Sequence, residues 1–256
     1  MDLFTSFLHF LGSGAATYIT AHQMRYSLTR PHLLAGFQLA ESGSVPFLET
    51  LSIRAATEGD SWLAEKLATH ASDECRHGQI FAHGLKQLGK QVIDIKSQPE
   101  KTEDGQPKEK KRSSFFETYF EGYSSTELKA ENIDWLVFMG STYILELDAG
   151  KDFLLMAKVL KDEERVERNL KAGILNIAED ENRHAAYLLE AMERRFSSTV
   201  TQETMMEWRT RKVKALMAMI GNLIEKGGNT LSLAEDIPSK QKSAGTKKLP
   251  VSLTTV

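Results

Sequence analysis

The sequence predicts an all-α protein built around a bundle of four helices. Proline is scarce, Ala, Leu, Glu and Lys are abundant, and no alternating run rich in Val, Ile or Thr is present, which favours helices over strands. A motif of the form Asp-Glu-x-Arg-His occurs twice, at residues 73–77 and 180–184, and each copy lies on an apolar stripe with helical spacing. With 256 residues, the chain is long enough to bury one sizeable core.

The first bundle helix is expected to begin near Pro31, a favourable first-turn position for proline, and to end before Gly59. Its apolar stripe carries one acid, Glu41. Pro46 is expected to bend the helix beside this acid, either as a tolerated surface kink or as a local widening that admits a substrate.

The second helix begins after Asp60 and carries the first motif, with Glu74 and His77 pointing into the core. His70 lies on the same face, one turn before Glu74, whereas the matching position of the second motif is Ile177. We interpret His70 as a core histidine bonded to backbone or carboxylate, in preference to a proton relay or an additional metal ligand.

The segment that follows the second helix is polar over residues 97–113 and punctuated by Pro and Gly, so we expect a mobile linker there. Such a linker suits a long crossover that brings the second half of the bundle back parallel to the first. Its basic run, Lys108–Arg112, indicates a solvated linker more than a binding patch. Residues 114–129 carry aromatic side chains at helical spacing, typical of core packing or of one wall of an apolar pocket.

The third and fourth helices are expected over about 132–160 and 165–196. The third carries Glu146 and, one turn earlier, Tyr143. The fourth carries the second motif and, one turn after His184, Tyr187. Each tyrosine is either a candidate catalytic group, redox-active or proton-donating, or a hydrogen-bonded core residue.

Both ends of the chain lie outside the four helices. Residues 4–11 carry an apolar stripe that predicts a short docked helix, and neither a signal peptide nor a membrane span is indicated. Residues 202–226 predict an amphipathic helix. From Trp208 onward, nine Lys and Arg face three acids. We therefore divide the chain into a helical domain over 1–226 and a disordered basic tail over 227–256.

Inward-facing acids need a cationic partner, because a buried unpaired carboxylate costs several kcal/mol. Glu41 precedes Glu74 by 33 positions and Glu146 precedes Glu181 by 35, so in antiparallel helices each pair of acids stands level within about 5 Å. One Glu from each of two helices and Glu-x-x-His from each of two others form a di-iron or di-manganese site. The predicted metal ligands are Glu41, Glu74, His77, Glu146, Glu181 and His184.

This pattern resembles the ferritin-like di-iron carboxylate superfamily over residues 32–90 and 130–196. The doubled motif is most similar to its oxygen-activating branch, which includes acyl-carrier desaturases, arylamine oxygenases, ribonucleotide reductase small subunits and related hydroxylases. The resemblance implies a ferritin-like bundle with a long crossover between the second and third helices, and additional helices at both ends. It also implies two Fe ions, with Mn/Fe or two Mn as alternatives, and O2 as co-substrate. Asp73 would orient His184 and Asp180 would orient His77 across the bundle, while Arg76 and Arg183 would hold the acids.

The expected function is therefore a non-haem di-iron oxygenase or oxidase acting on an apolar small molecule or a carrier-bound acyl substrate. Electrons would come from an external donor such as a ferredoxin or a reductase, and the basic C-terminal region would suit an acidic carrier protein. We expect a mainly apolar pocket that reaches the metal site and is lined partly by the first and third helices, in a monomer or small oligomer. Neither nucleic acid nor a membrane is an expected partner. One cysteine, Cys75, excludes a disulfide framework and favours the cytoplasm.

Other functions fit the same bundle. A ferroxidase, peroxide-scavenging or iron-storage protein is the main alternative, although the chain lacks a Cys-x-x-Cys module and carries roughly one hundred residues beyond the four helices. A tRNA-modifying hydroxylase draws weak support from the basic C-terminal region. A metal-free scaffold is disfavoured, since it would leave the inward acids uncompensated.

Overall fold

The structure is a computed structural model that describes residue 14 and residues 17–93, 113–161, 163–225 and 232–237. The predicted all-α class is confirmed, because the described residues are mostly helical and contain one small sheet. Residues 17–25 are also helical. The long helices are α2 (Arg30–Thr57), α3 (Ser61–Gln87), α5 (Trp135–Val159), α6 (Arg165–Arg195) and α7 (Ser198–Glu225).

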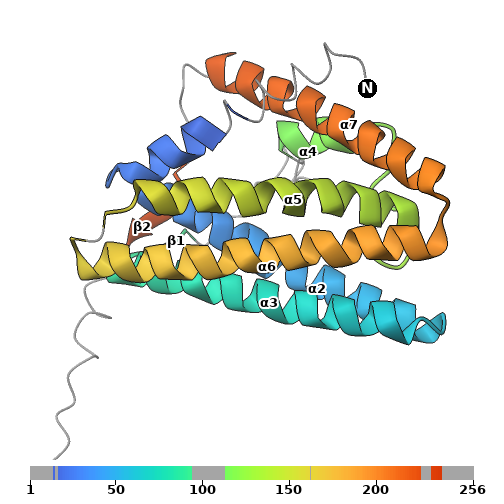
Figure 1. The fold of residues 1–256 in the computed structure, drawn as a ribbon. Helices are drawn as coiled ribbons and strands as arrows, with labels where there is room; N and C mark the ends of the chain where they lie inside the picture. The colour runs from blue at the N-terminus through green and yellow to red at the C-terminus, as the bar shows by residue number, and fades with distance from the viewer. Residues whose placement is uncertain (1–13, 15–16, 94–112, 162, 226–231, 238–256) are drawn as a thin grey trace, which may run out of the picture.

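Four of these helices lie side by side as two antiparallel pairs, α2 with α3 and α5 with α6, and α3 packs against α6 (Figure 1). Helices α2 and α6 run in one direction and α3 and α5 in the other, so α5 begins at the end of the bundle opposite to where α3 finishes. The end of α3 and the start of α5 thus lie at opposite ends of the bundle, as the predicted long crossover requires. Most of the expected linker, 97–113, lies outside the described residues.

The helix ends follow the local signals in the sequence. Gly59, with φ of +88°, makes the turn between α2 and α3, and the Asp60 side chain accepts a hydrogen bond from the backbone N–H of Leu63 at 2.9 Å. Asp134 caps α5 in the same way, accepting from the backbone N–H of Leu136 at 2.8 Å. Helix α2 continues through Pro46, whose missing N–H leaves one helical hydrogen bond unmade in the turn after Glu41.

The core consists of two apolar clusters with a polar layer between them. Along α2 the order is Leu34, Glu41 and Leu48, and each of the other three helices likewise passes from one cluster through an acid to the other. A polar layer that interrupts the core at the same level of four helices is costly unless its groups are paired. The flanking residues on α3, α5 and α6 are Leu67 and Phe81, Ile144 and Phe153, and Ile177 and Leu188.

Helix α7 covers one side of α5 and is itself in contact with the short helix α4 (Ser114–Tyr119) (Figure 1). Gly140 of α5 lets α7 approach, because a Cβ built there would lie 2.6 Å from Trp208 and 2.4 Å from Thr204. A buried ion pair between Lys212 and Asp148, at 2.8 Å, also joins α7 to α5.

Three expectations about the periphery need correction or lie beyond the described residues. The aromatic helix expected over 114–129 ends at Tyr119, and Gly122, with φ of +89°, lies in the turns that follow. Part of the predicted disordered tail is a strand, since β2 (Ala234–Asp236) pairs antiparallel with β1 (Lys90–Val92). The docked helix expected near residues 4–11 and the rest of the tail lie outside the described residues.

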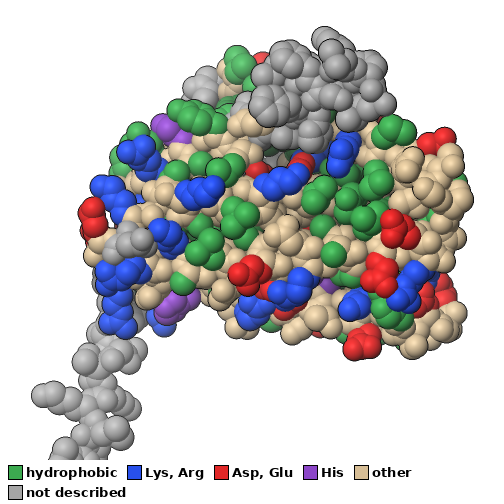
Figure 2. All heavy atoms as spheres, viewed as in Figure 1, with side chains coloured by type: hydrophobic (Ala, Val, Ile, Leu, Met, Phe, Trp, Pro, Cys, Tyr) green, Lys and Arg blue, Asp and Glu red, His purple; other side chains and the backbone are tan. Residues whose placement is uncertain are grey.

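The visible surface mixes apolar and charged side chains. In Figure 2, Lys and Arg side chains gather toward the end of the bundle where α5 finishes and α6 begins, whereas both charge signs mix toward the other end. Among the described segments, none of the helices is both long enough and apolar enough to cross a membrane.

Candidate metal centre

The polar layer between the two apolar clusters is a compact group of acids and imidazoles. Helices α2 and α5 contribute one Glu each, whereas α3 and α6 each contribute a Glu and a His three residues later. All but Glu146 are buried residues, and the Glu146 side chain is only 13% exposed. The structure thus brings together all six residues predicted as ligands and adds a seventh, His70.

One half of the group surrounds the Nδ1 atom of His77. This nitrogen lies 3.5 Å from Glu41 Oε2, 3.7 Å from Glu74 Oε1 and 3.4 Å from Glu181 Oε1. Donor atoms of these four residues all lie within 4.8 Å of one another, a spacing that one metal ion can span.

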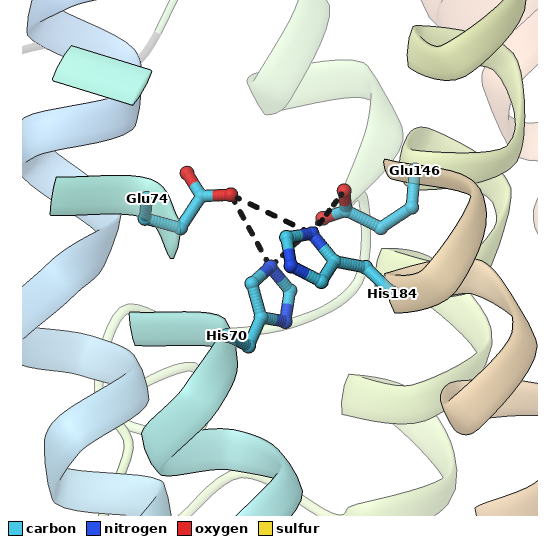
Figure 3. Close-up of side chains that lie close together, drawn as sticks. All are labelled: His70, Glu74, Glu146 and His184. Atoms are coloured by element: carbon cyan, nitrogen blue, oxygen red, sulfur yellow. Dashed lines mark ion pairs between the residues drawn. The ribbon is translucent and has the colours of Figure 1, made fainter. Parts of the chain in front are cut away.

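The other half surrounds the Nδ1 atom of His184. This nitrogen lies 3.9 Å from Glu74 Oε1, 3.7 Å from Glu146 Oε2 and 3.4 Å from Glu181 Oε2. His70, Glu74, Glu146 and His184 form the second set of donor atoms within 4.8 Å. In Figure 3, Glu74 and Glu146 approach the two imidazoles from α3 and α5 respectively.

Two of the four Glu carboxylates belong to both halves. Glu181 turns one oxygen toward each imidazole, and Glu74 Oε1 lies between them. Of the two imidazoles, Glu41 contacts that of His77 alone, and Glu146 contacts that of His184 alone. Two acids are thus shared, and each side adds one unshared acid and one imidazole. This is the ligand pattern of a dinuclear site.

Each of these imidazoles is held from behind by an aspartate of the opposite half. His77 Nε2 lies 3.0 Å from Asp180 Oδ2, and His184 Nε2 lies 3.2 Å from Asp73 Oδ2. These are the contacts across the bundle that the sequence led us to expect. A carboxylate at Nε2 keeps a proton on that atom, so Nδ1 is the nitrogen that faces the four acids and that can bind a metal ion once its own proton is displaced.

The inward Nδ1 atoms provide a test of whether a metal fits. Within the described part of the chain, Nδ1 of His77 and Nδ1 of His184 are buried and have no hydrogen-bond partner. Buried imidazole nitrogens are rarely left without a partner, because the lost hydrogen bond costs about 1–3 kcal/mol. Two unpartnered nitrogens facing four carboxylates therefore fit a pair of divalent cations.

The two arginines of the motifs hold the two aspartates. Arg76 forms ion pairs with Asp73 at 2.7 Å and with Asp180, while Arg183 pairs with Asp180 and lies 3.5 Å from Asp73. The hydrogen bond from His184 and the Arg76 guanidinium lower the pKa of Asp73. Burial would raise the pKa of Asp180, but Arg76 and His77 outweigh it and lower that pKa. Both aspartates are thereby kept ionised and able to hold the Nε2 protons.

The electrostatics of the cluster show an excess of buried negative charge. Burial and neighbouring carboxylates raise the pKa of Glu181 well above its ordinary value, and burial likewise raises the pKa of Glu41. Burial would lower the pKa of His77, but the carboxylates around it raise that pKa to about 10. Burial would also lower the pKa of His184, but the carboxylates around it raise that pKa to about 9. Without metal, protons must therefore occupy the cluster. Metal ions would displace them.

His70 and Tyr187 extend the cluster on the side of α3 and α6. His70 Nε2 lies 3.3 Å from Glu74 and 3.6 Å from Glu146, and its ring stacks on His184 with centroids 3.7 Å apart. Its other nitrogen, Nδ1, lies 2.8 Å from the Tyr187 hydroxyl. His70 is thus a core histidine beside a carboxylate, as interpreted from the sequence, and it also lies within reach of the donor atoms on the His184 side.

Three other residues refine the sequence interpretation. The Ser44 hydroxyl lies 2.9 Å from Glu74 Oε2, a contact that was not expected from the sequence although Ser44 is one turn after Glu41. Tyr143 is buried in the core, and no contact described for it reaches the acids or imidazoles. Glu49, eight residues after Glu41, is exposed and lies outside the cluster.

A pocket of about 400 Å³ lies between α2, α4, α5 and the turns after α4. It is mainly apolar and lined partly by α2 and α5, as predicted, but none of the seven cluster residues lines it, so the prediction that it reaches the metal site is wrong for this pocket. Its walls include four phenylalanines and three residues with hydroxyl groups, which are Phe47, Phe116, Phe120, Phe138, Ser125, Ser141 and Thr142.

Comparison of the chain with protein-family models, with curated proteins and with solved structures gives no match. The assignment of a metal centre therefore rests on the geometry and charge of these residues.

Proposed function

We propose that this chain is a ferritin-like di-iron protein that uses O2 to oxidise an apolar substrate. The observation that carries the proposal is the pair of inward Nδ1 atoms, buried without hydrogen-bond partners among the described residues, on either side of two carboxylates that contact both imidazoles. Four Glu carboxylates would also balance the charge of two divalent ions, so the polar layer would become neutral on binding.

The ligands divide between two positions. Glu41 and His77 would hold one ion, and Glu146 and His184 the other. Glu74 and Glu181 would be shared between the two ions, because each contacts both imidazoles. This donor set would hold two iron ions, which when bound would supply the electrons for O2 chemistry; two Mn or a Mn/Fe pair are the alternatives.

The chain's own residues would fix the ligands and manage protons. Asp180 and Asp73 hold the Nε2 protons of His77 and His184, and Arg76 and Arg183 keep the two aspartates in place. Ser44 orients one oxygen of Glu74. The Tyr187 hydroxyl and His70 Nδ1, 2.8 Å apart, form a hydrogen-bonded pair through which a proton can move toward Glu74.

The two apolar clusters would keep water away from this chemistry, since the acids and imidazoles lie between them. An external reductase or ferredoxin would restore the iron pair after each cycle, because the single cysteine of the chain excludes a built-in Cys-rich electron-transfer module.

The test is anaerobic loading with Fe(II), followed by exposure to O2, with Zn(II)-loaded protein as the redox-inert control. We expect O2 to be consumed by the iron form alone, with optical and Mössbauer changes assigned to a pair of coupled ferric ions. Iron that remains ferrous in air, or O2 consumption equal to that of the zinc form, would contradict the proposal. Continued uptake to hundreds of irons per assembly would indicate storage instead.

A further inference from the structure

The pocket beside α5 is lined by apolar side chains and by hydroxyl groups. Six of its nine lining residues are Phe, Leu or Ile, and the other three are Ser or Thr. Among the described residues, none with a charged side chain lines it. An ionised ligand would therefore lose its hydration without gaining a partner, which costs several kcal/mol. The lining thus favours an uncharged molecule with an apolar body.

The volume of the pocket limits the size of this molecule. A cavity of about 150 Å³ holds one benzene ring. A pocket of about 400 Å³ can therefore hold a molecule of about two fused rings with small substituents, or an apolar chain of similar volume. Four phenylalanine rings in the walls offer stacked and edge-on contacts to an aromatic ligand.

The pocket is open at one end and reaches the bundle at the other. Phe116, on the rim, is 44% exposed, whereas Phe138 and Ser141, on the floor, are 1% and 2% exposed. The floor belongs to α5, and Phe47 of α2 lines the wall beside it; these two helices each contribute one Glu to the cluster. A ligand entering past α4 would therefore move toward those two helices.

The floor lies on the face of α5 that also carries a cluster acid. Phe138, Thr142 and Glu146 follow one another at intervals of four residues, so they share one face of the helix. Thr142 is then about 6 Å from Glu146 along the helix axis. On α2, Phe47 is one turn beyond Ser44, the residue whose hydroxyl contacts Glu74. Because α2 and α5 are antiparallel, Thr142 and Phe47 are both displaced from the cluster toward the same end of the bundle.

We infer that this pocket binds an uncharged, compact molecule with an aromatic or other apolar body, with its inner end against Thr142 and directed toward the cluster. The Thr142 hydroxyl provides one polar group at the floor for a hydroxyl, amine or carbonyl of the ligand. The location and chemical class of the ligand follow from the pocket itself, whereas its role as the substrate rests on the proposed function.

The pocket is tested on metal-free protein with two probes that share a ring system, 2-naphthol and naphthalene-2-sulfonate. We expect 2-naphthol to bind and the sulfonate to bind at least tenfold more weakly. Thr142→Trp, which fills the floor, should weaken 2-naphthol binding at least tenfold. Thr57→Trp, a matched change at an exposed position near the end of α2, should leave it unchanged. Thr142→Leu serves the same purpose if circular dichroism shows that Thr142→Trp is misfolded.

Equal affinity for the two probes, or equal affinity of the two Trp variants for 2-naphthol, would overturn the assignment of the site. Direction toward the cluster is tested separately by NMR of 2-naphthol with Mn(II)-loaded and Zn(II)-loaded protein. Broadening of its resonances by Mn(II) alone supports the inference, and equal line widths overturn it. A protein that binds 2-naphthol but no metal would refute the proposed function and leave the pocket as a binding site.

Discussion

At the scale of single residues, the main feature is a set of acids that the fold buries together. Glu181 is buried against Glu146 and near Glu41 and Glu74, and burial together with these neighbours raises its pKa well above the ordinary value. A carboxylate in this position favours metal binding and opposes folding without metal, because the metal-free fold must either protonate it or bury its charge.

We therefore predict opposite effects of Glu181→Gln on stability and on metal binding. In a metal-free sample at neutral pH, the variant should be more stable by about 1–4 kcal/mol, because the neutral amide avoids the free-energy cost of either protonating Glu181 or burying its charge while the shape is kept. The raised pKa means that this difference grows as the pH rises above the ordinary Glu value and disappears below it. Thermal unfolding at several pH values measures it.

Metal affinity of the same variant should fall, as measured by competition with a chelator. Glu179→Gln, two residues earlier on the exposed face of α6, is the matched control and should change neither quantity. A Glu181→Gln protein that is less stable without metal and keeps wild-type affinity would contradict this description of the cluster.

The six ligands could be predicted from the sequence because acids and histidines are costly to bury on an apolar helix face unless they bind a cation. The sequence did not predict that His70 would join the donor set, since one histidine on a helix face has several ordinary roles and Ile177 breaks the repeat. Ser44 was missed because its contact with Glu74 depends on how α2 and α3 pack, and the sequence alone does not give that packing.

At the scale of helices and turns, Asp60 combines a cap with an ion pair. Its side chain accepts the Leu63 N–H at the start of α3 and pairs with Arg195 near the end of α6 at 2.6 Å. Burial would raise the pKa of Asp60, but the Arg195 guanidinium and the Leu63 N–H outweigh it and lower that pKa. The contribution of Asp60 to stability is therefore present above the ordinary Asp pKa and is lost as the pH falls through the lower folded value.

We predict that Asp60→Asn keeps the cap but loses the pH-dependent stability that the Asp60 carboxylate provides. The variant should therefore be less stable than wild type at neutral pH, and this difference should shrink as the pH falls from the ordinary Asp pKa through the lower folded value. Asp60→Ala should cost about 1 kcal/mol more than Asp60→Asn, because the cap is also lost. Chemical denaturation of the three proteins at neutral and acidic pH provides the measurement. Identical pH profiles for wild type and Asp60→Asn would show that the ion pair contributes nothing.

Two glycines within helices should respond to alanine in opposite directions. Gly140→Ala should destabilise by about 1–3 kcal/mol, because the new Cβ would overlap the buried Trp208 ring at 2.6 Å. Gly43→Ala should stabilise by about 0.5–1 kcal/mol, since a Cβ built at that position in α2 meets none of the described side chains within 4 Å. Denaturant midpoints compare the two, and a neutral Gly140→Ala would mean that α7 does not pack closely on α5.

The long helices could be predicted from the sequence to within a few residues because caps and apolar spacing agree at their ends. The expected start of α7 at 202 was late, since Ser198 begins it. Strands β1 and β2 were not predictable, because each has three residues and its partner lies more than one hundred positions away. The aromatic spacing of α4 continues through Phe120 and Tyr123, so the sequence pattern did not indicate that the helix ends at Tyr119.

At the scale of the whole molecule, the polar layer, the two apolar clusters and the pocket form one arrangement. The clusters enclose the acids and imidazoles from both ends of the bundle, and the pocket opens on the side covered by α4. The sequence predicted a pocket on α2 and α5 with residues 114–129 as one wall, but not that it would stop short of the cluster, since its depth depends on contacts between distant segments. The repeated motif did indicate where the centre of this arrangement would lie.

The presence of a dinuclear metal centre is tested most directly by the number of metal ions bound per chain together with their magnetic coupling. Protein reconstituted with Mn(II) should bind two ions per chain and give the electron paramagnetic resonance spectrum of a coupled pair. Glu41→Gln should lower the number bound, whereas Glu49→Gln, at an exposed position on the same helix, should still bind two. One ion or none per wild-type chain, or two ions without coupling, would contradict the presence of a dinuclear centre.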